Sequence, residues 1–222
     1  DLSAHYELVN DIDASDTSNW NGGSGFDPIG EYGASDVTFT GSFDGNGYTI
    51  SGLYIYRNST NAIGLFGMTR DGAEITQVGL ENVDITGEDY VGPLVGYHQN
   101  STVTEAYATG TISGDYRVGG LIGEIYDSTG DSEVSMSYAT ANVTGNNQVG
   151  GLVGSNYGGE VTNSFATGYV SGSGGGLLGY NSGTVTDSYW DTETTGQSFS
   201  NGGTGLTTDE MKGDAAKTNM NF

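Results

Sequence analysis

Carboxylates are the side chains of this sequence best placed to do chemistry, because 28 Asp and Glu stand among 222 residues with only two His and no Cys. Two carboxylates that flank a glycosidic bond can cleave it, one acting as acid and the other as base or nucleophile. The candidate pairs are Asp187 with Asp191, and Glu105 with the acidic loop at 127–131. Chance alone produces such pairs in so acidic a chain. We therefore predict that the protein is not an enzyme, and a polysaccharide-cleaving enzyme is the alternative.

The histidines and arginines favour the same prediction. His5 and His98 are the only histidines, and the sequence has no HExxH motif of the kind that zinc proteases use. His98 is expected to be a solvated loop residue. Lyase chemistry usually needs a cation to stabilise a developing enolate, and the repeat region offers only Arg70 and Arg117 for that role. Without cysteine there is no thiolate chemistry and no disulfide.

Calcium is the one cofactor that the sequence suggests. The turn Asp44-Gly45-Asn46-Gly47 and the loop at 127–131 place carboxylate and amide oxygens on tight bends. Neither stretch matches an EF-hand loop. The alternative is a plain turn, since glycine and asparagine tolerate a positive φ. Asp44 and Asn46 are therefore candidate calcium ligands, and no other cofactor is expected.

Aromatic rings recur at one place in four consecutive stretches of the chain, as Tyr107, Tyr138, Phe165 and Tyr189. Side chains alternate between the two faces of a strand, so in a straight strand these rings point outward and the small residues beside them point inward. An exposed ladder of rings could stack against sugars. The alternative is that a bend, a loop or the C-terminal tail buries the rings.

Three sequons for N-glycosylation are present, at Asn58, Asn100 and Asn142. Chance matches are expected in a chain so rich in Ser, Thr and Asn. Glycosylation at these asparagines therefore depends on whether the source organism has the pathway.

A repeated phrase specifies the elements that must position all of these residues. We call it the glycine–leucine phrase, and its central leucines lie 29, 27, 31 and 25 residues apart. Its five copies are AIGLFG (62–67), VGPLVG (91–96), VGGLIG (118–123), VGGLVG (149–154) and GGGLLG (174–179). A phrase repeated at a near-fixed period indicates a solenoid, in which each unit buries its apolar face only by stacking on the next.

The repeats predict an all-β fold, a parallel β-helix of about five to six coils. In such a stack each residue lies on the equivalent residue of the neighbouring coil, so Leu121 is expected between Leu94 and Leu152. Val143 is likewise expected between Ile112 and Val170. Length varies mainly between the two parts of each unit, as at 124–131, which predicts a loop there. Glycines are expected at the corners, where a Cβ would clash.

The chain divides into three parts. Residues 1–61 are expected to form an N-terminal entry coil that caps the solenoid, with a strand at 5–15 and a glycine-rich loop at 18–35. Residues 62–196 carry the repeats, and stacking should stop at 190–194, where Trp190 and polar residues replace the small and apolar ones. Residues 197–222 are a C-terminal cap or linker, with a short helix through 210–212 that Thr208 or Asp209 could cap.

The net charge of −23 restricts the partners and the environment. A dispersed acidic surface repels nucleic acid and anionic membranes, and no segment approaches 18 apolar residues, so neither nucleic-acid binding nor membrane insertion is expected. Such a surface fits high salt, where the Debye length falls to about 3 Å at 1 M and self-repulsion is screened. An acidic secreted protein from an ordinary environment is the alternative. The abrupt ends indicate a piece of a longer polypeptide.

The phrase VGGLVG joined to VTNSFATGYVSG resembles the GLUG-motif repeats of bacterial and archaeal surface proteins. The resemblance covers roughly residues 6–212, including the flanking stretches FDGNGYTISGL and SYWDTETTGQS. It implies a right-handed parallel β-helix in a large secreted or cell-surface protein, often adhesin-like, whose partner would be a surface glycan or a protein receptor. Some immunoglobulin-cleaving metalloproteases carry such repeats outside their catalytic domain. A non-catalytic stalk or adhesive module is therefore the leading hypothesis, and a carbohydrate-binding β-helix is the alternative.

Overall fold

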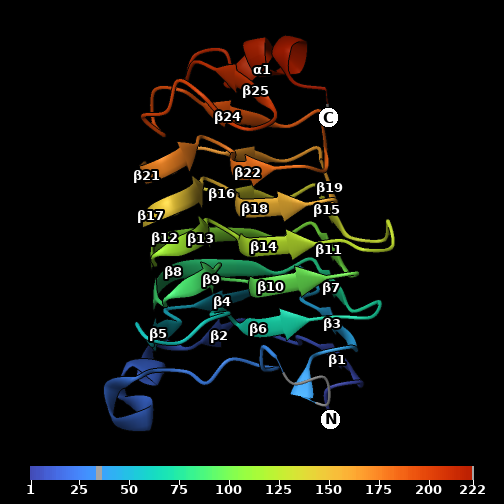
Figure 1. The fold of residues 1–222 in the computed structure, drawn as a ribbon, viewed down its shortest axis with the longest axis vertical. Coiled ribbons are helices and arrows are strands. Elements are labelled where there is room, and N and C mark those ends of the chain that lie inside the picture. Colours follow the sequence, from blue (N-terminus) through green and yellow to red (C-terminus); the bar gives the residue numbers. More distant parts are fainter. Residues whose placement is uncertain (34–36, 222) are drawn as a thin grey trace.

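Short strands separated by sharp corners wind upward as successive coils, each lying on the one before it (Figure 1). This computed structural model describes residues 1–33 and 37–221. Strands of neighbouring coils pair in parallel on every side of the stack. The predicted parallel β-helix is therefore confirmed.

The described strands form three sheets, which are the walls of the helix. The five-stranded sheet contains β6 (Phe66–Thr69), β10 (Val95–Gln99), β14 (Ile122–Tyr126), β18 (Val153–Tyr157) and β22 (Leu178–Asn181). The seven-stranded sheet contains β1 (His5–Glu7), β3 (Ser42–Asp44), β7 (Glu74–Thr76), β11 (Thr102–Thr104), β15 (Glu133–Ser135), β19 (Glu160–Thr162) and β23 (Thr184–Thr186). Because five coils contribute to all three sheets, the helix has about five complete turns.

The thirteen-stranded sheet is the longest wall, because in several coils it collects two strands. Its members are β2 (Ile12–Asp13), β4 (Thr49–Ser51), β5 (Tyr54–Tyr56), β8 (Gly79–Thr86), β9 (Asp89–Val91), β12 (Tyr107–Ser113), β13 (Tyr116–Gly119), β16 (Tyr138–Ala139), β17 (Asn142–Gly150), β20 (Phe165–Ala166), β21 (Val170–Gly175), β24 (Tyr189–Asp191) and β25 (Thr204–Leu206). The extra residue of the first repeat is absorbed by a bulge between β8 and β12, where Ala108 pairs with Leu80 but Gly110 pairs with Val83.

The leucines of the glycine–leucine phrase form the axis of the core. The N–H of Leu94 donates to the carbonyl of Leu121 at 3.1 Å, and that of Leu121 donates to the carbonyl of Leu152 at 2.9 Å. All three side chains are fully buried. Val143 pairs with Ile112 on one side and with Val170 on the other. The predicted register of both ladders is therefore confirmed.

The phrase ends in glycine because two passes of the backbone meet there. A Cβ placed on Gly154 would lie 2.5 Å from the carbonyl carbon of Arg117 and 2.5 Å from the carbonyl oxygen of Gly123. No side chain fits in that space, since real Cβ contacts are essentially never so short. The corner therefore requires glycine for close approach of the coils.

The N-terminal part differs from the prediction in detail. Residues 5–15 do not form one strand, because the chain turns after Glu7 and moves from the seven-stranded to the thirteen-stranded sheet, as β1 and then β2. Tyr6 and Ile12 are consequently exposed. A stretch of 3₁₀ structure, η1 (Ser15–Gly23), overlaps the start of the predicted glycine-rich loop and is interrupted by non-helical backbone at residues 20–22. Residues 34–35 of that loop lie outside the described residues.

The C-terminal part also differs. Stacking continues beyond the predicted stop, since β24 pairs with β25 and Trp190 lies between Ala166 and Gly205. The expected helix at 210–212 is absent, and α1 (Gly213–Asn219) forms instead. The Glu210 carboxylate accepts hydrogen bonds from the N–H and the hydroxyl of Thr207 at 2.8 and 2.9 Å, which fixes a turn where the helix was expected.

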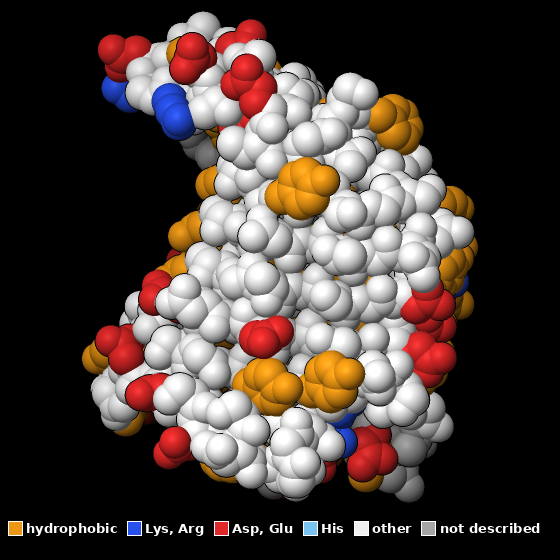
Figure 2. Space-filling view, turned by 90° about the vertical axis from the view of Figure 1, so that its left-hand side faces the viewer, with side chains coloured by type: hydrophobic (Ala, Val, Ile, Leu, Met, Phe, Trp, Pro, Cys, Tyr) orange, Lys and Arg blue, Asp and Glu red, His pale blue; other side chains and the backbone are white. Residues whose placement is uncertain are grey.

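Acidic side chains are dispersed on the visible face of the molecule rather than gathered in one patch (Figure 2). Figure 2 shows acidic side chains scattered over one face among uncharged ones. Within residues 1–33 and 37–221, no helix has the length and apolar character needed to cross a membrane.

Candidate functional site

The predicted aromatic ladder points outward and is stacked. The ring centroids of Tyr107 and Tyr138 are 4.9 Å apart with planes at 1°, and those of Tyr138 and Phe165 are 5.0 Å apart at 3°. The residues that follow each ring in the strand, Ala108 and Ala139 among them, are fully buried. At Tyr107, Tyr138 and Phe165 the strand is therefore arranged as predicted, with the rings outward and the small residues inward.

The ring faces of the ladder contact one another rather than solvent. At the lower end Tyr107 covers Gly79, where an added Cβ would lie 2.4 Å from the ring. At the upper end Tyr189 is only 5% exposed, and its hydroxyl accepts the N–H of Asn221 at 3.0 Å. The tail thus covers the fourth ring. Sugar stacking on the ladder stays a prediction, and the geometry offers ring edges for it.

The oxygen-rich turns use their carboxylates to hold themselves together. Asp44 accepts the N–H of Asn46 at 2.8 Å, and the Asn46 amide donates to the carbonyl of Leu8 at 2.8 Å. Asp127 accepts four backbone N–H groups of its own loop, including that of Gly130 at 2.6 Å. These bonds lower the pKa of Asp127 against the effect of burial. Calcium binding at Asp44 and Asn46 stays a prediction.

The carboxylate pairs weighed for catalysis each have structural partners. Asp191 accepts the N–H groups of Glu193 and Thr194 and the hydroxyl of Thr208. Asp187 accepts a hydrogen bond from the side-chain amide of Asn221, and Glu105 accepts one from the side-chain amide of Gln77. In the described part of the chain, no three His, Asp or Glu side chains gather in a way that could hold a metal.

The sequon asparagines differ in exposure. Asn58 and Asn142 are exposed, whereas Asn100 is half-buried. The side-chain oxygen of Asn142 accepts the N–H of Tyr169 at 3.2 Å, and that of Asn100 accepts the N–H of Ser128 at 3.3 Å. Glycosylation stays a prediction, and Asn58 and Asn142 are more accessible than Asn100.

The prediction that His98 is solvated is wrong. β10 continues past the glycine–leucine phrase, so His98 takes an interior position between Thr69 and Ile125 and is fully buried. Its Nδ1 lies 2.8 Å from the Thr69 hydroxyl. Burial lowers the pKa of His98 to about 4, so the ring is neutral at pH 7.

In the next coil, β14 likewise continues past its glycine–leucine phrase, which shortens the loop predicted at 124–131. Glu124 belongs to β14 and is buried, and the loop begins only at Asp127. The Glu124 carboxylate lies 2.6 Å from a guanidinium nitrogen of Arg117, and the Glu124 and Arg117 side chains are 3% and 17% exposed. Arg117 directly precedes one glycine–leucine phrase and Glu124 directly follows it. The sequence therefore carried a signal for this ion pair, because its two residues flank a phrase that folds back on itself.

Tyrosines surround this ion pair. The guanidinium carbon of Arg117 lies 4.7 Å from the ring centroid of Tyr116, 4.9 Å from that of Tyr90 and 5.7 Å from that of Tyr157. Such cation–π contacts stabilise the charge of a partly desolvated guanidinium. Burial raises the pKa of Glu124 to about 7, although Arg117 opposes this. We call Tyr90, Tyr97, Tyr116, Tyr126 and Tyr157 with this ion pair the tyrosine corner.

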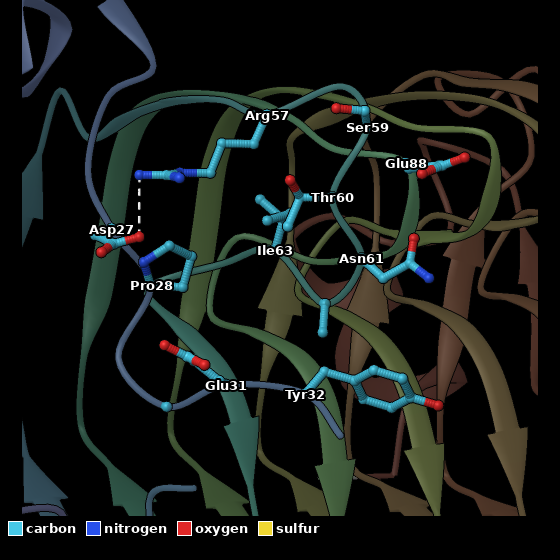
Figure 3. A pocket seen from close by; sticks show the side chains of 12 residues that line it. Asp27, Pro28, Glu31, Tyr32, Arg57, Ser59, Thr60, Asn61, Ile63 and Glu88 are labelled. Carbon is cyan, nitrogen blue, oxygen red and sulfur yellow. Dashed lines mark ion pairs between the residues drawn. The ribbon is translucent and has the colours of Figure 1, made fainter. Parts of the chain in front are cut away.

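A polar cleft of about 460 Å³ adjoins the tyrosine corner (Figure 3). Its walls come from three stretches of the chain, namely 27–32, 57–63 and Glu88. Arg57 and Asp27 form an ion pair of 3.0 Å across one side. Tyr32 lies at the lower edge, and its ring centroid is 5.2 Å from that of Tyr90 and 5.0 Å from that of Tyr97. Cleft and corner therefore form one continuous surface.

The cleft carries negative charge. Among the described residues that line it there are three carboxylates, Asp27, Glu31 and Glu88, and one cation, Arg57. Because Arg57 already pairs with Asp27, two carboxylates are left to set the local field. This cleft was not predictable from the sequence, because its walls lie far apart in the chain and no motif connects them.

The fold defines a class of protein, the parallel β-helices built from stacked sequence repeats. The family described as the GLUG motif matches residues 145–171, which confirms the predicted resemblance over that repeat. Halomucin from Haloquadratum walsbyi is 48% identical over 120 residues, which are 53% of this chain and 1% of that protein. A Gly-rich membrane protein from Evansella cellulosilytica is 38% identical over 95 residues, 41% of this chain and 10% of that protein.

The chain thus spans only a small fraction of the length of both relatives. A solved structure from Bacteroides ovatus, described as an immunoglobulin A1 protease, superposes with a TM-score of 0.65 over 94% of this chain and 79% of that one. At 15% identity this likeness concerns the fold alone. The parallel β-helix therefore occurs elsewhere with little sequence in common.

Proposed function

We propose that the chain is a non-catalytic β-helix module of a larger secreted or cell-surface protein, serving as a stalk or an adhesive element. The observation that carries the proposal is the stack of five coils, each paired in parallel with the next in three sheets, with the core leucines hydrogen-bonded in series (Figure 1). Each coil contacts only its neighbours, so such a rod extends by adding coils and suits a spacer. Its partner would be a surface glycan or a protein receptor.

Two further observations support this proposal. Both relatives are much longer than the matched part, as expected for a module within a large protein, and one is named as a membrane protein. The carboxylates weighed for catalysis bind turns and neighbouring amides instead of converging on a shared space.

Cell-surface exposure is tested on intact cells of the source organism. Antibodies raised against the purified chain should label unpermeabilised cells, and brief treatment with external protease should remove the label while a cytoplasmic marker survives. Labelling that appears only after permeabilisation would contradict the proposal.

We further propose that the module works at high salt. With a net charge of −23 on a scattered acidic surface, screening should relieve repulsion and stabilise the fold. The melting temperature should rise between low and about 1 M NaCl, and each gain of about 1 kcal/mol would appear as roughly 2–4 °C. Sucrose at matched water activity serves as the control for non-ionic effects. A melting temperature that does not change with NaCl would exclude this adaptation.

A further inference from the structure

We propose that the polar cleft beside the tyrosine corner binds an uncharged saccharide, with Tyr32 as its aromatic platform. This goes beyond the role as a stalk, and it concerns residues other than the aromatic ladder. The proposal rests on the shape of the cleft, on its unpaired polar groups, on its charge and on the position of Tyr32.

The cleft is preformed by backbone hydrogen bonds among its walls. Ile29 donates to the carbonyl of Leu65 at 2.9 Å, which fixes the segment 27–32 against the first phrase. Glu88 donates to the carbonyl of Thr60 at 2.9 Å, and the N–H of Asp89 donates to the side chain of Asn61 at 3.3 Å. The volume of about 460 Å³ lies in the range of small-molecule sites. A ligand would therefore meet an existing shape.

Polar groups of the cleft are free to bind hydroxyls. Among the described residues, the carboxylates of Glu31 and Glu88 have neither a hydrogen-bond partner nor an ion-pair partner, and both side chains are exposed. Ionised carboxylates only accept hydrogen bonds, and such charge-assisted bonds are stronger than neutral ones. Vicinal hydroxyls of a sugar are donors of the required kind. Asn61 also lines the cleft (Figure 3).

Tyr32 supplies the apolar contact that a sugar ring needs. Its side chain is 43% exposed, and Figure 3 shows its ring below Asn61, pointing away from the Glu31 carboxylate. The tilted contacts with Tyr90 and Tyr97, at 32° and 56°, hold the ring in place without the parallel stacking of the ladder. An amphipathic ring that is held in place loses little entropy on binding.

The charge of the cleft selects among saccharides. Two unpaired carboxylates repel uronic acids, sialic acids and sulfated sugars, whose anions would lie within a few ångströms of them. Like charges placed together across an interface cost affinity. Uncharged saccharides are therefore the class that fits.

The test uses the complete purified chain and a panel of uncharged trisaccharides, with maltotriose, cellotriose and mannotriose as probes and trigalacturonate as the anionic counterpart. Binding is followed by NMR titration at about 50 mM salt, where charge discrimination is little screened. At least one uncharged trisaccharide should bind with a millimolar dissociation constant, and trigalacturonate should bind at least about tenfold more weakly. Tyr32→Ala and Glu88→Gln should each weaken the uncharged ligand about tenfold.

Tyr169→Ala is the matched control, because Tyr169 is 56% exposed and lies outside the cleft. It should leave binding unchanged, and circular dichroism should show all three variants folded. No binding by any uncharged probe at about 20 mM would overturn the proposal. So would equal binding of trigalacturonate, or binding that survives both cleft substitutions. Surface labelling of cells would be unaffected by these results, so the stalk proposal is judged separately.

Discussion

Leu121→Ala is expected to lower the free energy of unfolding by about 3–5 kcal/mol. Leu121 is fully buried in the middle coil, with Leu94 and Leu152 directly below and above it. Deleting a buried isobutyl group loses its transfer free energy and leaves a cavity that the rigid coils cannot close. Guanidinium unfolding, followed by far-UV circular dichroism, measures the loss.

Val9→Ala provides the comparison, because Val9 is 71% exposed and the substitution also removes only apolar atoms. It should change stability by no more than about 0.5 kcal/mol. A Leu121→Ala cost as small as that of Val9→Ala would mean that the leucine ladder does not hold the coils together.

Arg117→Met is expected to lower stability by about 3 kcal/mol at pH 9. The substitution keeps most of the side-chain volume but leaves Glu124 buried without its cation and removes three cation–π contacts. Breaking a buried pair usually costs about 3–5 kcal/mol. We expect the lower end of this range, because protonation of Glu124 removes part of the cost of burying its charge.

The cost should depend on pH with a definite sign. Burial raises the folded pKa of Glu124 from 4.5 to about 7, so the folded state holds this proton more tightly than the unfolded state. The group's contribution to stability is fully present below about pH 4.5 and is lost as pH rises through about 7, which amounts to about 3 kcal/mol. Arg117→Met raises that pKa further, so its extra cost should appear above pH 7.

Glu124→Gln separates this effect from packing. The amide cannot ionise, so the double variant Arg117→Met with Glu124→Gln should show none of this dependence between pH 5 and pH 9, and the single Arg117→Met variant should. Chemical unfolding at a series of pH values checks both. An Arg117→Met cost that is equal at pH 5 and pH 9 would show that the buried carboxylate is not its source.

The interior of the fold was predictable because a solenoid turns sequence period into spatial contact. Residues one period apart lie in the same position of neighbouring coils, so the order Ile112, Val143, Val170 could be stated in advance. Strand alternation placed the aromatic ladder outside by the same logic. Strand ends were less predictable, since polar residues such as His98 continue β10 and are buried.

The sequence by itself determined the stacked coils, the core leucines, the ladder and the acidic surface, because each depends on spacing or composition alone. Only the tertiary structure decided the contacts across a corner and across a coil. It joined Arg117 to Glu124 around a folded phrase, closed the ring faces of the ladder, and brought Tyr32 against Tyr90 beside the cleft. Period fixes which residues stack along the axis, whereas backbone turns and the path of the N-terminal segment fix which residues meet around it.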